Sequence, residues 1–195
     1  MAAGRPREFD YDQALEQAMR VFWSKGYEGT SMPDLTGAMG MNRPSIYASF
    51  GNKEELFRKA LALYAAQAQA FFREALDKPT IHESVSAFLC GAATSLACPE
   101  SPRGCMAVQG ALACSDEAEA VRLEALGRRE DVVKVLLERF ERGVVEDEIP
   151  KDTDINGLAR FFTVIVQGMS VQSAGGATKE QLHAIAVHAL KVLPV

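Results

Sequence analysis

Residues 31–53 have the sequence SMPDLTGAMGMNRPSIYASFGNK, which contains the signals for two short helices and for the turn between them. Ser31 and Asn42 each carry a side-chain oxygen that can cap the first turn of a helix, and a proline follows each cap inside that turn, where no amide donor is required. Gly40 lies between the two segments and can adopt the left-handed conformation that ends a helix. The stretch therefore predicts a helix-turn-helix, whose second helix is suited to a DNA major groove.

The second helix of this motif would turn small or polar side chains outward. Short side chains let the backbone approach the bases, and Arg43 is suited to the edge of a guanine. Tyr47 and Lys53 are suited to phosphate contacts, as is Ser31 at the preceding cap. The candidate DNA-binding residues are Ser31, Arg43, Pro44, Ser45, Tyr47 and Lys53, together with Arg5 and Arg7 in a short basic arm that could follow the backbone or enter a minor groove.

Helix signals recur along the rest of the chain, whereas alternating strand patterns do not. Side-chain caps followed three residues later by an acidic or amide group begin at Asn52, Thr80, Asp116 and Thr178, and apolar residues recur at helical spacing. The sequence therefore predicts an all-α protein with about nine helices. These are expected at residues 10–25, 31–38, 42–49, 52–77, 80–97, 104–114, 116–143, 153–173 and 178–192.

The net charge of −5 argues, taken alone, against nucleic acid as a partner, because phosphate binding requires a basic surface. The charge is unevenly distributed, however. Residues 1–60 hold 8 Lys and Arg against 8 Asp and Glu, whereas residues 61–195 hold 13 against 18. The acidic excess lies outside the predicted DNA-binding motif, so the two parts of the chain are expected to differ in function.

Other classes of function lack support in the sequence. The N-terminal residues have no apolar signal-peptide core, and the longest uncharged stretches are too short or too polar for a bilayer span, which predicts a cytoplasmic protein without a membrane partner. The three histidines are dispersed and the four cysteines form no CxxC pair, so no metal site is expected. No cofactor motif and no set of catalytic residues can be placed, so an enzyme is not expected.

Residues 9–57 closely resemble the DNA-binding domain of the TetR family of transcriptional regulators. The shared features are Phe22, Gly26, Tyr27 and Thr30-Ser31 near the end of the first helix, Ile46-Tyr47 and Phe50 in the second helix of the motif, and NKEEL at residues 52–56. Pro44, Ala48 and Ser49 depart from the residues that are common in the family. The resemblance implies a ligand-responsive repressor that binds a palindromic double-stranded operator as a homodimer.

The resemblance also implies how the chain is divided. A helix-turn-helix DNA-binding domain would occupy residues 1–51, and a helical effector-binding and dimerisation domain would occupy residues 52–195. The helices expected at 153–173 and 178–192 would pair across a two-fold axis, and a pocket for a small-molecule effector would lie between the middle helices. The candidate lining residues, which suit a mostly apolar molecule, are Phe71, Phe88, Met106, Gln109, Phe161 and Gln167.

Two alternatives remain open at the level of sequence. Cys98 and Cys105 flank the loop at residues 99–104, and Arg103 beside Cys105 could favour a thiolate, so a regulator of the same fold could sense oxidants or electrophiles. The other alternative is an all-α interaction module without DNA binding, in which residues 31–53 only pack into the core.

Overall fold

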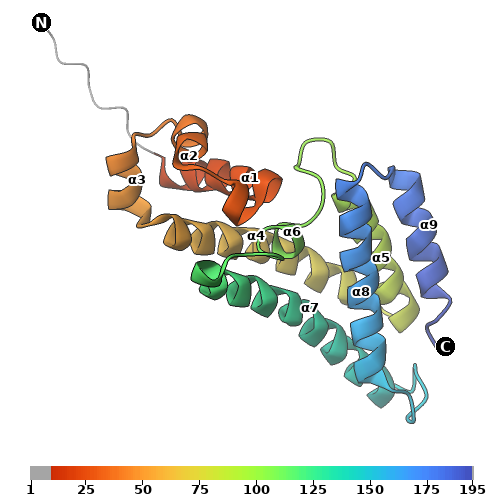
Figure 1. Cartoon of the computed structure of the whole chain (residues 1–195). Coiled ribbons are helices and arrows are strands. Elements are labelled where there is room, and N and C mark those ends of the chain that lie inside the picture. The colour runs from red at the N-terminus through yellow and green to blue at the C-terminus, as the bar shows by residue number, and fades with distance from the viewer. Residues whose placement is uncertain (1–9, 195) are drawn as a thin grey trace, which may run out of the picture.

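The computed structural model describes residues 10–194, and within this range it contains helices and no strands, which confirms the predicted all-α class. The helices are α1 (Tyr11–Gly29), α2 (Met32–Met39), α3 (Arg43–Phe50), α4 (Lys53–Leu76), α5 (Ile81–Leu96), α6 (Met106–Gln109), α7 (Glu119–Val145), α8 (Ile155–Ala174) and α9 (Lys179–Leu190), with a short 3-10 helix, η1 (Asp116–Ala118), before α7. In Figure 1, α1 to α3 form one end of the molecule and α4 runs from them into a larger body made of α5 to α9.

The helix starts are fixed by local hydrogen bonds. Ser31, Asn52, Thr80 and Thr178 each cap a helix and take part in a reciprocal capping box, as the sequence predicts. The cap predicted at Asp116 is wrong. Asp116 lies inside η1, and neither η1 nor α7 has a side-chain cap.

The helix predicted at residues 104–114 is also much shorter than expected, because α6 ends at Gln109. The next residue, Gly110, accepts a hydrogen bond at 2.7 Å from the backbone amide of Tyr27 in α1. A continued helix would need that carbonyl for the amide four residues later. The contact with α1 therefore competes with the helix, and residues 110–115 run on without one.

Two hydrophobic cores support the two ends of the molecule. The N-terminal core packs α1, α2 and α3 against the first half of α4, α6 and the beginning of α7. The C-terminal core packs the end of α4 with α5, α7, α8 and α9. Because α4 contributes to both cores, it joins the two ends as one continuous rod (Figure 1). Within the described part of the chain, no helix is both long and apolar enough to span a bilayer.

Candidate functional site

The exposed side of α3 is the first candidate site. Ile46 and Phe50 are buried, with 1% and 0% of their surfaces exposed, and they anchor the helix in the N-terminal core. Asn42 caps the helix by accepting a hydrogen bond from the backbone amide of Ser45 at 2.9 Å. The remaining residues, which we call the recognition surface, are exposed, and they are Arg43, Pro44, Ser45, Tyr47, Ala48 and Ser49.

Arg43 and Tyr47 form a pair on the recognition surface. The Arg43 guanidinium donates to the Tyr47 hydroxyl oxygen, at 3.3 Å from Nε and 3.1 Å from Nη2, and it lies 5.5 Å from the centre of the Tyr47 ring. The two residues are one helical turn apart, which is the spacing at which side chains meet on one helix face. The pair holds a guanidinium with unused donors at the first position of α3.

Ser31 caps α2 and Lys53 begins α4, and both side chains are engaged with neighbouring groups. Ser31 Oγ donates to Asp34 Oδ2 at 2.7 Å. The hydrogen bond from Lys25, followed by those from Ser31, holds the pKa of the Asp34 carboxyl far below its usual range. Lys53 is partly buried, and its Nζ lies 4.4 Å from the centre of the Tyr27 ring in α1. Arg5 and Arg7 lie outside the described residues.

A polar groove runs between the start of α1 and the α2–α3 turn. Ser45 and Ser49 of the recognition surface line it on one side. Gln13 and Gln17 of α1, which are not among the residues predicted from the sequence, line it on the other side. Their signal in the sequence is their place on α1 away from its buried stripe of Ala14, Ala18, Met19 and Phe22.

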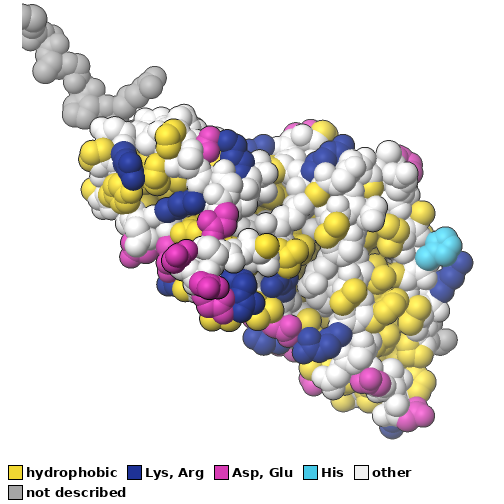
Figure 2. Space-filling view, in the orientation of Figure 1, with side chains coloured by type: hydrophobic (Ala, Val, Ile, Leu, Met, Phe, Trp, Pro, Cys, Tyr) yellow, Lys and Arg dark blue, Asp and Glu magenta, His cyan; other side chains and the backbone are white. Residues whose placement is uncertain are grey.

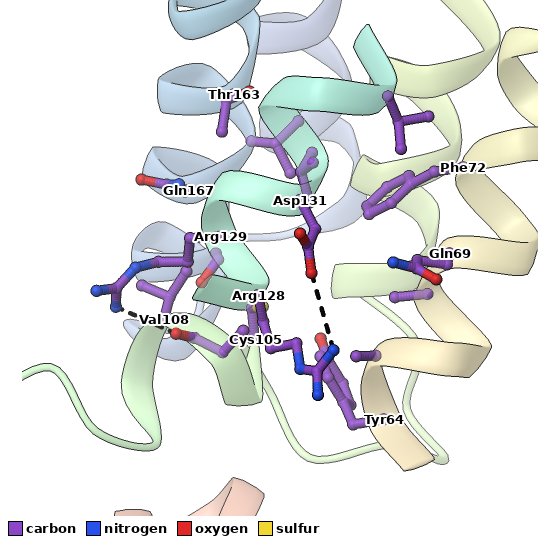
Figure 3. A pocket seen from close by; sticks show the side chains of 17 residues that line it. Tyr64, Gln69, Phe72, Cys105, Val108, Arg128, Arg129, Asp131, Thr163 and Gln167 are labelled. Atoms are coloured by element: carbon purple, nitrogen blue, oxygen red, sulfur yellow. Dashed lines mark hydrogen bonds and ion pairs between the residues drawn. The ribbon is translucent and has the colours of Figure 1, made fainter. Parts of the chain in front are cut away.

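A cavity in the larger body is the second candidate site. It has a volume of about 80 Å³, its surface is almost wholly apolar, and α4, α6, α7 and α8 enclose it (Figure 3). The apolar lining comes mainly from Ala65, Ala68, Phe72, Ala107, Val108, Val132, Val135 and Val166. Tyr64, Gln69, Cys105, Arg128, Arg129, Asp131, Thr163, Gln167 and Ser170 add polar groups.

Of the six residues expected to line an effector pocket, the structure places Gln167 at this cavity. Phe88 and Met106 are fully buried in the two cores, and Phe71 packs against Gly91 of α5. Gln109 lies beside Gly104 in a cleft next to α1, and Phe161 lies in a groove between α8 and α9. Helical periodicity shows which face of a helix is apolar, but the packing of several helices decides which part of that face lines a cavity, so these five side chains lie elsewhere.

The four cysteines are free thiols, and one of them lines the cavity. Cys105 lies beside Tyr64; burial raises the pKa of Tyr64 well above its usual value, and the Cys105 side chain raises it further. Cys98 donates its thiol hydrogen to Glu100 Oε2 at 2.9 Å. The Arg103 guanidinium donates to the carbonyl of Ala177 at 3.2 Å, beyond the end of α8.

The segment from Cys105 to Ser115 links the cavity to α1. Gly104 directly precedes the segment, and its carbonyl accepts a hydrogen bond from Trp23 Nε1 at 3.1 Å. Within the segment, the carbonyl of Gly110 accepts a hydrogen bond from the backbone amide of Tyr27. Glu28 Oε1 accepts two hydrogen bonds from Ser115, from the amide at 3.0 Å and from the hydroxyl at 2.9 Å. These hydrogen bonds join the segment that follows the cavity wall to the last two turns of α1.

The outer side of α8 and α9 is apolar and exposed. Figure 2 shows hydrophobic side chains gathered over these two helices. Val164 and Val171 of α8 have 62% and 54% of their surfaces exposed, and Val187 of α9 has 52%. A shallow groove between the helices is lined by Phe161, Ile165, Ala184, Ile185, His188, Ala189 and Val192. We call this surface the α8–α9 face.

Comparison with known proteins places the chain in a family. The family model described as bacterial regulatory proteins, tetR family, matches residues 14–60, and the model of the tetracyclin repressor-like C-terminal domain matches residues 82–188. The HTH-type transcriptional repressor ComR of Escherichia coli (strain K12) is 34% identical over 98% of this chain and 92% of its own length. The repressor BdcR of the same organism is 28% identical over 95% of this chain and 90% of its own.

Solved structures agree with these matches. A cysteine-substituted variant of the TetR family transcriptional regulator CifR, complexed with 26bp double-strand operator DNA, has a TM-score of 0.94 and 41% identity over 98% of this chain and 100% of that one. A TetR transcriptional regulator from Rhodococcus sp. RHA1 has the same identity and a TM-score of 0.63, over 95% and 99% of the two chains. The relatives are transcriptional regulators rather than enzymes. The chain belongs to the TetR family of bacterial transcriptional regulators, with an N-terminal helix-turn-helix and a helical C-terminal domain.

Proposed function

We propose that the chain is a cytoplasmic repressor that binds a palindromic operator as a homodimer and is released by a small molecule bound in the cavity. The recognition surface carries this proposal, because it exposes Arg43, Ser45 and Tyr47 on a helix that Ile46 and Phe50 hold in place. The likeness to a neighbour complexed with operator DNA supports it, since the backbone arrangement of this chain is nearly the same.

The roles proposed for individual residues follow from their chemistry. Arg43 would bond the edge of a guanine with the donors that Tyr47 leaves free, and Pro44 and Ser45 would let α3 approach the bases closely. Tyr47, Lys53 and Ser31 would contact phosphates. Arg5 and Arg7 would extend the contact along the DNA, a role that rests on the sequence.

The α8–α9 face is proposed as the surface that pairs with a second copy of the chain. Exposed apolar side chains such as Val164, Val171 and Val187 favour burial against a partner. A two-fold axis would turn the same face of each copy toward the other and would set two α3 helices for two half-sites of a palindrome.

Release by an effector would require differential affinity for two conformations. A molecule in the cavity would contact Cys105, Ala107 and Val108. These residues begin the segment that is hydrogen-bonded to α1. If the molecule binds more tightly when that segment has shifted, it lowers the population that fits the operator.

Mobility-shift assays on the DNA around its own gene test the proposal, with the full chain at several salt concentrations. We expect sequence-specific binding that weakens as salt rises, because phosphate contacts release counterions. Unlabelled DNA of equal length and shuffled sequence should compete poorly for the protein. A stable dimer with no affinity for this DNA would contradict the proposal and favour an interaction module.

A second candidate, a thiol sensor of the same fold, is favoured by one observation. Cys105 lies in the cavity wall and begins the segment that is hydrogen-bonded to α1. A modified thiol at Cys105 would therefore act on the same connection between the cavity and α1. Treatment with N-ethylmaleimide, which adds the thiol across its double bond, should then reduce operator binding, and Cys105→Ser should abolish this response. Cys98→Ser is the control for the other cysteine, whose thiol is hydrogen-bonded to Glu100, and it should keep the response.

A further inference from the structure

Two polar atoms in the cavity wall have no hydrogen-bond partner. The hydroxyl of Ser170 is buried, with 1% of the residue exposed, and no described group bonds it. The Nε–H of Arg128 is likewise buried and unpaired. Both residues line the cavity, and Arg128 is labelled in Figure 3. An Arg Nε–H can only donate, and a serine hydroxyl can donate as well as accept, so each of these two lining residues carries a donor for which the protein supplies no acceptor.

The charged groups of the wall, by contrast, are engaged with one another. Arg128 pairs with Glu124 at 2.8 Å and with Asp131 at 3.8 Å, and Asp131 also pairs with Lys134 at 3.0 Å. The remaining guanidinium, of Arg129, donates to the carbonyl of Ala107 at 3.2 Å and points away from Asp131 (Figure 3). A charged ligand would meet both signs at close range. A neutral ligand avoids that repulsion, and it avoids the larger desolvation cost of a buried charge.

Three other hydrogen-bonding side chains of the wall do not change this preference. Thr163 already donates its hydroxyl hydrogen to the carbonyl of Ala159 at 2.8 Å. Gln69 and Gln167 carry amides that can either donate or accept, so they accommodate an acceptor as readily as a donor. The unpaired donors therefore decide which chemistry fits.

The volume limits the size of the ligand. A cavity of this kind needs on the order of 10–15 Å³ for each water-sized group, so about 80 Å³ has room for roughly six such groups. The apolar side chains of Ala68, Val132 and Val166 leave most of that space without a polar partner.

We propose that the cavity selects small uncharged molecules with an apolar body and one hydrogen-bond-accepting oxygen, such as a carbonyl, which Ser170 and Arg128 recognise. This inference rests on the proposed function and specifies the chemical class of its effector. The acceptor would satisfy a donor that is buried and unpaired in the empty protein, and the body would fill the apolar space.

Cyclohexanone and methylenecyclohexane form a matched pair of probes, because they differ only by an oxygen in place of a CH₂ group. Their binding to the full chain can be measured by ligand-observed NMR without DNA. A purely apolar cavity would prefer the hydrocarbon, which is the more hydrophobic of the two. We expect the reverse order, with the ketone bound about fivefold more tightly, the worth of roughly one net hydrogen bond.

Variants identify the donor and the location. Ser170→Ala should remove most of the preference for the ketone, and since its hydroxyl has no partner, the variant should still fold. Thr163→Val is the matched control on the same helix, because its hydroxyl is already bonded, and it should keep the preference. Val166→Phe should fill the cavity and abolish binding of both probes.

The outcomes separate this inference from the proposed function. Equal or tighter binding of the hydrocarbon would overturn it, as would tighter binding of cyclohexylamine or cyclohexanecarboxylate than of the ketone. Ketone-selective binding that disappears in Ser170→Ala would support it whether or not the ketone displaces operator DNA. Failure of the chain to bind operator would instead count against the proposed function alone.

Discussion

The recognition surface and the cavity hold their polar groups in opposite settings. On α3, Arg43 and Ser45 stand in water above the buried Ile46 and Phe50, so their unused hydrogen-bonding groups are hydrated. In the cavity, Ser170 is shut away from solvent without a partner, which costs about 1–3 kcal/mol. One end would gain affinity by matching the charges and base edges of a partner, and the other by pairing a group that the fold leaves unpaired.

The larger body, which holds the cavity, also contains a buried ion pair. Arg139 has 2% of its side chain exposed and pairs with Glu148 at 2.9 Å, and its Nε donates to Ser84 Oγ at 3.0 Å. Burial alone would raise the pKa of Glu148, but hydrogen bonds from the Ile81 amide and Arg139 outweigh it and lower that pKa. The pair ties α5 and α7 to the turn that precedes α8.

Removal of this pair should give the largest effect of those considered. Arg139→Met leaves Glu148 without its partner, so we expect the free energy of unfolding to fall by about 3 kcal/mol. Urea unfolding at pH 7 measures the change. Arg142→Met is the control, since Arg142 is 41% exposed and its ion pairs with Asp77 and Glu146 are long, and it should change stability by less than about 0.5 kcal/mol. Equal losses in both variants would show that burial of the pair is unimportant.

The same pair predicts a dependence on pH. Because the folded protein lowers the pKa of Glu148, the pair stabilises the fold above the ordinary glutamate pKa of about 4.5, and this stability is lost as pH falls through the lower folded value. Glu148→Gln should therefore make unfolding less steeply dependent on pH below about 4.5. An unchanged slope would mean that other carboxyl groups carry the acid response.

The next effect in size concerns the recognition surface. Arg43→Ala should weaken operator binding by about 1–3 kcal/mol and relax the preference at one base pair of each half-site. Arg43→Lys is the sharper variant, because it keeps the positive charge but loses the planar fork that Tyr47 orients. It should retain affinity for unrelated DNA and lose base preference. Binding to an operator library measures both, and an unchanged preference in Arg43→Lys would contradict a base contact.

Lys53→Ala should have a smaller and more uniform effect. A phosphate contact carries no sequence information, so affinity should fall similarly for operator and unrelated DNA, and the dependence of log affinity on log salt should flatten by about one unit. Lys179→Ala removes an equal charge from the start of α9 and should leave that dependence unchanged. A loss of base preference in Lys53→Ala would contradict the phosphate role.

The two regions also differ in what the sequence reveals about them. The caps at Ser31 and Thr80 and the outward positions of α3 depend on residues within one or two helical turns, so they could be predicted. The early end of α6 could not, because the Gly110 carbonyl bonds Tyr27, which is 83 residues away in the chain. The cavity depends on how four helices pack together, and Gln167 is the one predicted lining residue that the structure places there.

The smallest effect tests whether the two regions communicate through the segment between them. Ser115→Ala removes one of the two hydrogen bonds to Glu28 and leaves the bond from the Ser115 amide, so the fold and the operator affinity of the free protein should hardly change. A ligand in the cavity would then be coupled less strongly to α1.

We expect the factor by which a cavity ligand weakens operator binding to shrink about twofold to fivefold in Ser115→Ala. Titration of operator complexes with cyclohexanone measures this factor. Glu28→Gln, which keeps an acceptor oxygen, should shrink the factor less than Ser115→Ala does. If both variants respond like the parent chain, the coupling does not run through this contact, and α4, which passes through both cores, is the remaining rigid connection.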